Sequence, residues 1–81
     1  MTVIVTKSAV KDFKKISEPY KSVIKEKIKG LEEFPKLAQV KQFKNHDPKF
    51  WLRVGDYRIL FDVIDDTVRV ARILHRRESY R

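Results

Sequence analysis

The sequence contains no cysteine, and it has only two glycines and two histidines among its 81 residues. The absence of cysteine excludes disulfide bonds, a thiolate nucleophile and zinc sites built on cysteine. Two glycines are too few for a glycine-rich loop around phosphate groups, and the histidines lack the H-x-x-x-H spacing of a zinc site. We therefore expect neither a metal ion nor another cofactor.

Long apolar runs are also absent. No stretch approaches the roughly 20 apolar residues that cross a membrane, and the first ten residues are not apolar enough for a signal peptide. The sequence predicts a soluble, cytoplasmic protein that does not bind membranes. Its length suits a single domain over residues 1–81 with one hydrophobic core.

Positive charge is what the chain has in excess. Its formal net charge is +8 and its pI is about 9.9, which favours an acidic partner such as nucleic acid or an acidic protein. All twelve lysines lie at or before Lys49, and all seven arginines lie at or after Arg53. Because the arginine fork suits bidentate binding of phosphate, we expect phosphate contacts in the C-terminal half.

The C-terminal stretch from residue 50 predicts two β-hairpins, with turns at residues 54–57 and 64–67. Pairing across the first turn sets Arg53 opposite Arg58. Side chains alternate between the two faces of a sheet. One face is then a core face, with Phe50, Leu52, Val54, Tyr57, Ile59, Phe61 and Val63. The other face carries Lys49, Trp51, Arg53, Arg58, Leu60 and Asp62.

Two arginines directly opposite each other repel. A polyanion lying across this basic face would turn the repulsion into attraction, whereas the alternative is that Arg53 and Arg58 are ordinary solvated residues. The last strand has a related irregularity, because strict alternation from Val68 and Val70 would point Arg72 inward. We expect a β-bulge near residues 71–72 that returns Ile73 to the core and sets Leu74 and Arg76 on the basic face.

The N-terminal half predicts a strand at residues 2–6, placed inside the sheet and not at its edge, followed by two amphipathic helices. Ser8 is the expected N-cap of the first helix, and the second runs over residues 19–33. A short strand is expected at residues 40–44. The second helix carries a lysine stripe, which is either a nucleic-acid contact or a solvated face: Lys21, Lys25 and Lys29.

Two segments carry a resemblance to a known family. The hairpin sequence LRVGDYR at residues 52–58 and the ending HRRESYR at residues 75–81, in a chain of this size and element order, resemble the RelE/ParE superfamily of toxins. The resemblance covers essentially the whole chain. It implies an α+β, RelE-like fold of order β-α-α-β-β-β, in which two N-terminal helices pack on one face of a small, twisted, mainly antiparallel sheet.

The resemblance also implies a function. RelE-like members are ribosome-dependent messenger-RNA endonucleases of the A site, inhibited by an acidic RelB-like antitoxin. By this resemblance the catalytic residues are Arg58, Arg76 and Tyr80. The substrate contacts would be Lys44, Lys49, Trp51, Arg53, Arg77 and Arg81. Trp51 stands where some relatives have another lysine, and the C-terminal tail is short.

These residues fit cleavage by attack of the ribose 2′-OH on the adjacent phosphate, which needs a base and stabilisation of negative charge. Nearby arginines would favour the Tyr80 phenolate, Arg58 and Arg76 would hold the phosphate, and Trp51 would stack on a base. Tyr80 could instead simply cover the sheet end. Two other functions stay open: a ParE-like inhibitor of DNA gyrase, and a nucleic-acid-binding module without catalysis.

Overall fold

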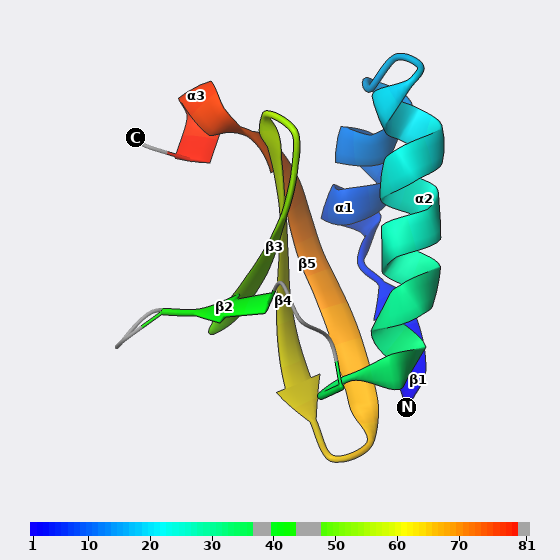
Figure 1. Ribbon diagram of the computed structural model, residues 1–81, viewed down its shortest axis with the longest axis vertical. Coiled ribbons are helices and arrows are strands. Elements are labelled where there is room, and N and C mark those ends of the chain that lie inside the picture. The colour runs from blue at the N-terminus through cyan, green and yellow to red at the C-terminus, as the bar shows by residue number, and fades with distance from the viewer. Residues whose placement is uncertain (37–39, 44–47, 80–81) are drawn as a thin grey trace.

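The computed structural model describes residues 1–36, 40–43 and 48–79. These residues form a five-stranded sheet with two longer helices (Figure 1). The elements in chain order are β1 (Thr2–Val5), α1 (Lys7–Lys14), α2 (Tyr20–Gly30), the 3₁₀ turn η1 (Leu31–Glu33), β2 (Val40–Gln42), β3 (Phe50–Val54), β4 (Tyr57–Ile64), β5 (Thr67–His75) and α3 (Arg76–Ser79).

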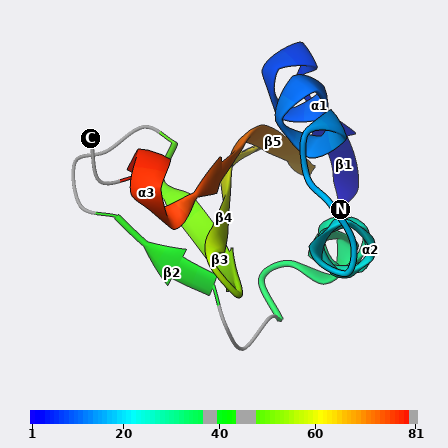
Figure 2. The same cartoon turned by 90° about the horizontal axis from the view of Figure 1, so that it is seen from above.

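The strands are arranged in the order β1-β5-β4-β3-β2. Among the strand pairs of the described residues, β1 and β5 are parallel, and the other neighbours are antiparallel. Helices α1 and α2 lie together on one side of the sheet (Figure 2), so the predicted α+β fold is confirmed. The predicted position of the first strand is wrong. β1 is an edge strand, and its outer residues Ile4 and Val5 stay 47% and 39% exposed.

The first hairpin has the predicted register, with Arg53 opposite Arg58 and Trp51 opposite Leu60. The face toward the helices is the apolar core. Phe61 is fully buried there, and its ring stacks on Phe50 at 5.6 Å between centroids. The core is made of Ala9, Ile16, Ile24, Leu31, Leu52, Val54, Ile59, Phe61, Val68, Val70 and Ile73. The opposite face of the hairpin carries Arg53, which is exposed, and Arg58, which is half-buried, beside the buried Leu60.

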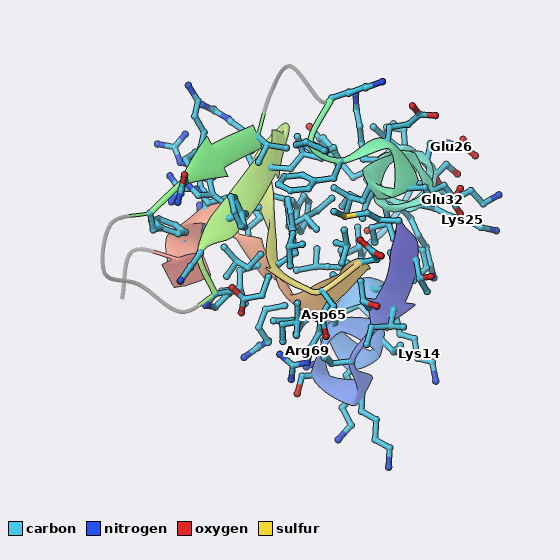
Figure 3. All side chains as sticks on the ribbon, turned by 90° about the horizontal axis from the view of Figure 1, so that it is seen from below. Lys14, Lys25, Glu26, Glu32, Asp65 and Arg69 are labelled. Carbon is cyan, nitrogen blue, oxygen red and sulfur yellow. The ribbon has the colours of Figure 1, made fainter. Side chains whose placement is uncertain are left out.

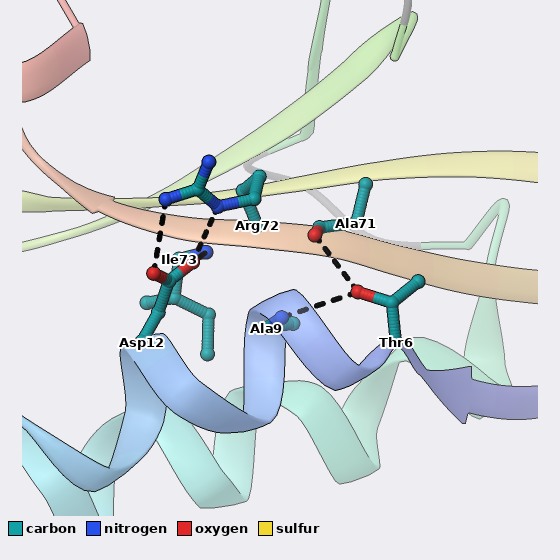
Figure 4. Close-up of polar contacts among 6 residues, drawn as sticks. All are labelled: Thr6, Ala9, Asp12, Ala71, Arg72 and Ile73. Carbon is teal, nitrogen blue, oxygen red and sulfur yellow. Dashed lines mark hydrogen bonds and ion pairs between the residues drawn. The ribbon is translucent and has the colours of Figure 1, made fainter.

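The predicted β-bulge is present in β5. Leu60 of β4 pairs with Arg72, but the next residue, Phe61, pairs with Val70, so Ala71 is the extra residue. Ile73 consequently returns to the core, where it is 3% exposed. Beyond the end of β1, the edge of β5 is held by α1 instead of by a strand (Figure 4). The Asp12 carboxylate accepts the Ile73 N–H at 2.9 Å and binds Arg72 through two hydrogen bonds of 2.7 and 3.0 Å.

The helix ends differ in part from expectation. Thr6, not Ser8, is the N-cap of α1, because its hydroxyl accepts the Ala9 N–H at 3.1 Å while donating to the Ala71 carbonyl in β5 (Figure 4). At α2, the Glu18 carboxylate accepts hydrogen bonds from the N–H and the hydroxyl of Ser22. The expected strand after the helices is confirmed as β2, which is three residues long.

Among the helices of the described residues, none is both long and apolar enough to cross a membrane. Over the same residues, no group of three or more histidine, cysteine or acidic side chains is suited to hold a metal ion.

Candidate phosphate-binding and active site

The candidate site lies at the end of the sheet where β3 turns into β4, next to α3 (Figure 1). The turn depends on Gly55, whose φ of +56° lies in the left-handed region that favours glycine. Tyr20 of α2 packs against this turn so closely that a Cβ on Gly55 would lie 2.5 Å from the Tyr20 Cε1 atom. The same ring contacts Tyr57 at 5.6 Å between centroids. The first turn of α2 therefore fixes the hairpin tip.

An open pocket of about 100 Å³ lies at this hairpin tip, and we call it the arginine pocket. Three guanidinium groups line it, from Arg53 of β3, Arg58 of β4 and Arg76 of α3. The complete lining is Arg53, Gly55, Asp56, Tyr57, Arg58 and Arg76. Three arginines against one carboxylate make the pocket suited to an anion the size of a phosphate group.

Each arginine of the pocket is held by a separate contact. Arg53 donates from Nε to the Gly55 carbonyl at 3.0 Å. The Arg58 guanidinium lies over the Trp51 ring at 4.3 Å from its centroid, a cation–π contact. The Arg76 N–H donates to the Asp56 carbonyl at 2.6 Å, which attaches the start of α3 to the hairpin turn. The guanidinium groups of Arg53 and Arg58 are therefore positioned before any ligand binds, whereas the contact of Arg76 holds its backbone.

The structure thus brings together three of the predicted site residues: Arg53, Arg58 and Arg76. Trp51 lies beside the pocket, where its ring contacts Arg58 and also stacks with Phe43 at 5.9 Å. A second predicted substrate contact is more distant. Lys49 precedes the opposite end of β3, four residues from Arg53, which corresponds to about 13 Å along a strand.

The other predicted residues are in or near the C-terminal helix or lie outside the described residues. Arg77 of α3 is exposed, and its N–H donates to His75 Nδ1 at 3.3 Å. Lys44, Tyr80 and Arg81 lie outside the described residues. Their predicted roles remain predictions.

Sequence reasoning missed Asp56 as a component of the site, because a Gly-Asp pair is usual in a hairpin turn. Its carboxylate lies 3.9 Å from the Arg76 guanidinium, and both groups are at least half exposed. An ion pair this exposed contributes little to stability. It does give Arg76 a local partner that a phosphate group can replace. The alternation of charge along Arg53, Asp56 and Arg58 is the signal in the sequence that indicates this arrangement.

The match to known proteins agrees with this geometry. A family model described as the ParE toxin of the type II toxin–antitoxin system parDE matches residues 3–80. Toxin RelE3 of Methanocaldococcus jannaschii is 32% identical, over 99% of this chain and 96% of that protein. The chain belongs to the RelE/ParE superfamily of toxins. It is a RelE-like toxin of a toxin–antitoxin pair.

Solved structures of two relatives share the fold of this toxin. The RelB–RelE antitoxin–toxin complex from Methanococcus jannaschii matches with a TM-score of 0.80 and 30% identity, covering 95% of this chain and 94% of that one. The RelBE2 toxin–antitoxin complex from Mycobacterium tuberculosis matches with a TM-score of 0.76 and 28% identity, covering 91% and 95%. The sheet and helix arrangement of the toxin is therefore that of RelE.

Proposed function

We propose that this toxin is an endoribonuclease that cleaves messenger RNA in the ribosomal A site and so inhibits translation in the cytoplasm. The observation that carries the proposal is the arginine pocket, in which Arg53, Arg58 and Arg76 line one hollow of phosphate size. In the proposed reaction the ribose 2′-oxygen bonds to the adjacent phosphorus, and the bond to the 5′-oxygen of the next nucleotide breaks. The products are a 2′,3′-cyclic phosphate and a 5′-hydroxyl, whose oxygen takes its proton from water.

Arg58 and Arg76 would bind the non-bridging oxygens of the scissile phosphate and counter the negative charge that develops on them. Tyr80, one residue beyond the end of α3, would take the proton from the 2′-OH. Cations near a phenol favour its ionised form, so the arginines would assist this role. Lys49, Arg53 and Arg77 would bind further phosphates, as would Lys44 and Arg81, and Trp51 would stack on a base as well as holding Arg58.

We propose that the ribosome orients the substrate, because the pocket offers few groups suited to proton transfer. Correct positioning alone is worth about 7–11 kcal/mol of a reaction barrier. The solved relative from Methanococcus jannaschii is a complex of RelE with a RelB antitoxin, which supports an acidic RelB-like antitoxin as the protein partner. The net charge of +8 would favour binding to such a partner.

A translation reaction with purified toxin tests the proposal, with the ends of the messenger RNA mapped by primer extension. We expect cuts in phase with codons that require ribosomes and disappear in Arg76→Ala and Tyr80→Phe variants. Equally rapid cutting of the same RNA without ribosomes would contradict the ribosome dependence.

A second candidate is inhibition of DNA gyrase, which the match to a ParE family model keeps open without favouring it over the RelE-like function. A supercoiling assay with purified gyrase separates the two functions. Intact messenger RNA together with loss of supercoiling would establish the ParE-like function and reject the catalytic roles proposed for the arginines.

A further inference from the structure

A second, larger pocket lies on the other side of Tyr57, between the end of α1 and β5. Its volume is about 310 Å³, which is at the lower end of the range for small-molecule sites. We call it the α1–β5 pocket. Its lining residues are Asp12, Lys15, Ile16, Tyr57, Arg72, Ile73 and His75.

The α1–β5 pocket and the arginine pocket share Tyr57 as a wall. This wall is held in place, because the Tyr57 ring meets His75 edge to face at 5.2 Å and Tyr20 at 5.6 Å between centroids. His75 is also the residue directly before Arg76 of the arginine pocket. The two pockets are therefore adjacent, so a nucleotide in the α1–β5 pocket would be a neighbour of one bound in the arginine pocket.

The charges of the α1–β5 pocket suit such a neighbour. Burial of Asp12 raises its pKa. This effect is outweighed by the hydrogen bonds from Arg72 and Ile73 and by the positive charges of Arg72 and Lys15, which lower the pKa. The pKa of Asp12 therefore lies below its ordinary value of 3.8. Asp12 is thus ionised at neutral pH, and its two hydrogen bonds to Arg72 balance that charge. The Lys15 ammonium adds a positive charge that this pair does not balance.

We propose that the α1–β5 pocket is a second nucleotide subsite of this toxin, which binds the nucleotide next to the scissile phosphate. The nucleoside occupies the volume against Tyr57 and His75, and Lys15 binds the phosphate of that nucleotide. Lys15 is a binding residue in this arrangement and takes no part in proton transfer. The inference rests on the proposed function, since it assumes that RNA occupies the arginine pocket.

The test measures binding of short 2′-O-methyl RNAs, which have no free 2′-OH and so are not cleaved. A dinucleotide has one internal phosphate, which would occupy the arginine pocket, so it offers no phosphate to Lys15, whereas a tetranucleotide has further phosphates and offers one. We expect Lys15→Ala to weaken tetranucleotide binding about threefold to fivefold and to leave dinucleotide binding unchanged. The slope of log K against log salt concentration should fall by about 0.7, as for one lost phosphate contact on a single strand.

The matched control is Lys14→Ala, because Lys14 is the neighbouring lysine on α1 and points away from the body of the protein (Figure 3). It should change neither affinity. In NMR titrations, the ring signals of His75 should shift with both oligonucleotides, because each places a nucleoside next to the phosphate in the arginine pocket.

The outcomes separate the subsite from the proposed function. The subsite would be overturned if Lys15→Ala and Lys14→Ala changed the affinity for the tetranucleotide equally, or if the His75 signals did not shift with the tetranucleotide. Either result would overturn it even if dinucleotide binding still depended on Arg58. Dinucleotide binding that is unchanged in Arg58→Ala would overturn both the arginine pocket as an RNA site and the subsite next to it.

Discussion

Replacing Gly55 by alanine should destabilise the toxin through two separable effects. The first is conformational, because the φ of +56° at this position costs about 1–2 kcal/mol for a residue with a Cβ. The second is steric, because the new Cβ would lie 2.5 Å from Tyr20 Cε1. The Tyr20 ring would have to move and would lose its contact with Tyr57, and such aromatic pairs contribute about 0.5–1.5 kcal/mol.

The two effects together predict a loss of about 2–3 kcal/mol in the free energy of unfolding, or roughly 10–20 °C in Tm for a domain of this size. Urea and thermal denaturation followed by circular dichroism measure both quantities. In a Tyr20→Ala background the steric effect is absent, so Gly55→Ala should there cost about 1 kcal/mol less.

The matched control is Gly30→Ala in the last turn of α2. Gly30 has a helical φ of −63°, and a Cβ built on it meets no atom within 4 Å. This substitution should stabilise the toxin by about 0.5–1 kcal/mol. The reasoning is refuted if Gly55→Ala is as stable as the wild type, or if it costs the same with and without the Tyr20 ring.

Two further predictions concern Asp12 and Trp51. The folded-state pKa of Asp12 lies below 3.8, so the stability it confers is fully present above that pH and is lost as the pH falls through the folded-state pKa. Asp12→Asn should therefore flatten the acid decline in the free energy of unfolding measured by urea titration at several pH values; an unchanged decline would contradict the role of the carboxylate. Trp51→Ala should lower the rate of RNA cleavage about twofold to fivefold by releasing Arg58, whereas Trp51→Phe should keep most of the rate; equal rates for both variants would show that the ring does not orient Arg58.

Much of the sheet could be predicted because alternation of side chains is a strong local signal. The hairpin register, the core face and the bulge at Ala71 all follow from which apolar residues must face the helices. The edge position of β1 could not be predicted in this way. The apolar residues of β1 predict a strand with a neighbour on each side, yet Ile4 is 47% exposed. The order of the strands depends on the pairing of segments that are distant in the sequence.

The candidate site could be predicted in part. Cross-strand pairing alone sets Arg53 opposite Arg58, but the contribution of Arg76 depends on where the end of β5 meets the hairpin turn. The role of Asp12 in holding the edge of β5 could not be predicted from the sequence either, because Asp12 and its partners in β5 lie about 60 positions apart in the sequence. Long-range side-chain contacts of this kind leave no periodic signal in the sequence.

The most direct test of the account is the rate of messenger-RNA cleavage on ribosomes stalled with an empty A site, measured in a single turnover for Arg58→Ala and Arg69→Ala. Arg69 is an exposed arginine of β5 that does not line the arginine pocket (Figure 3). The account predicts that Arg58→Ala lowers the rate by about 100-fold or more, as for loss of a group that stabilises developing charge, while Arg69→Ala cleaves near the wild-type rate. Equal rates for the two variants would contradict the claim that the arginine pocket is the active site.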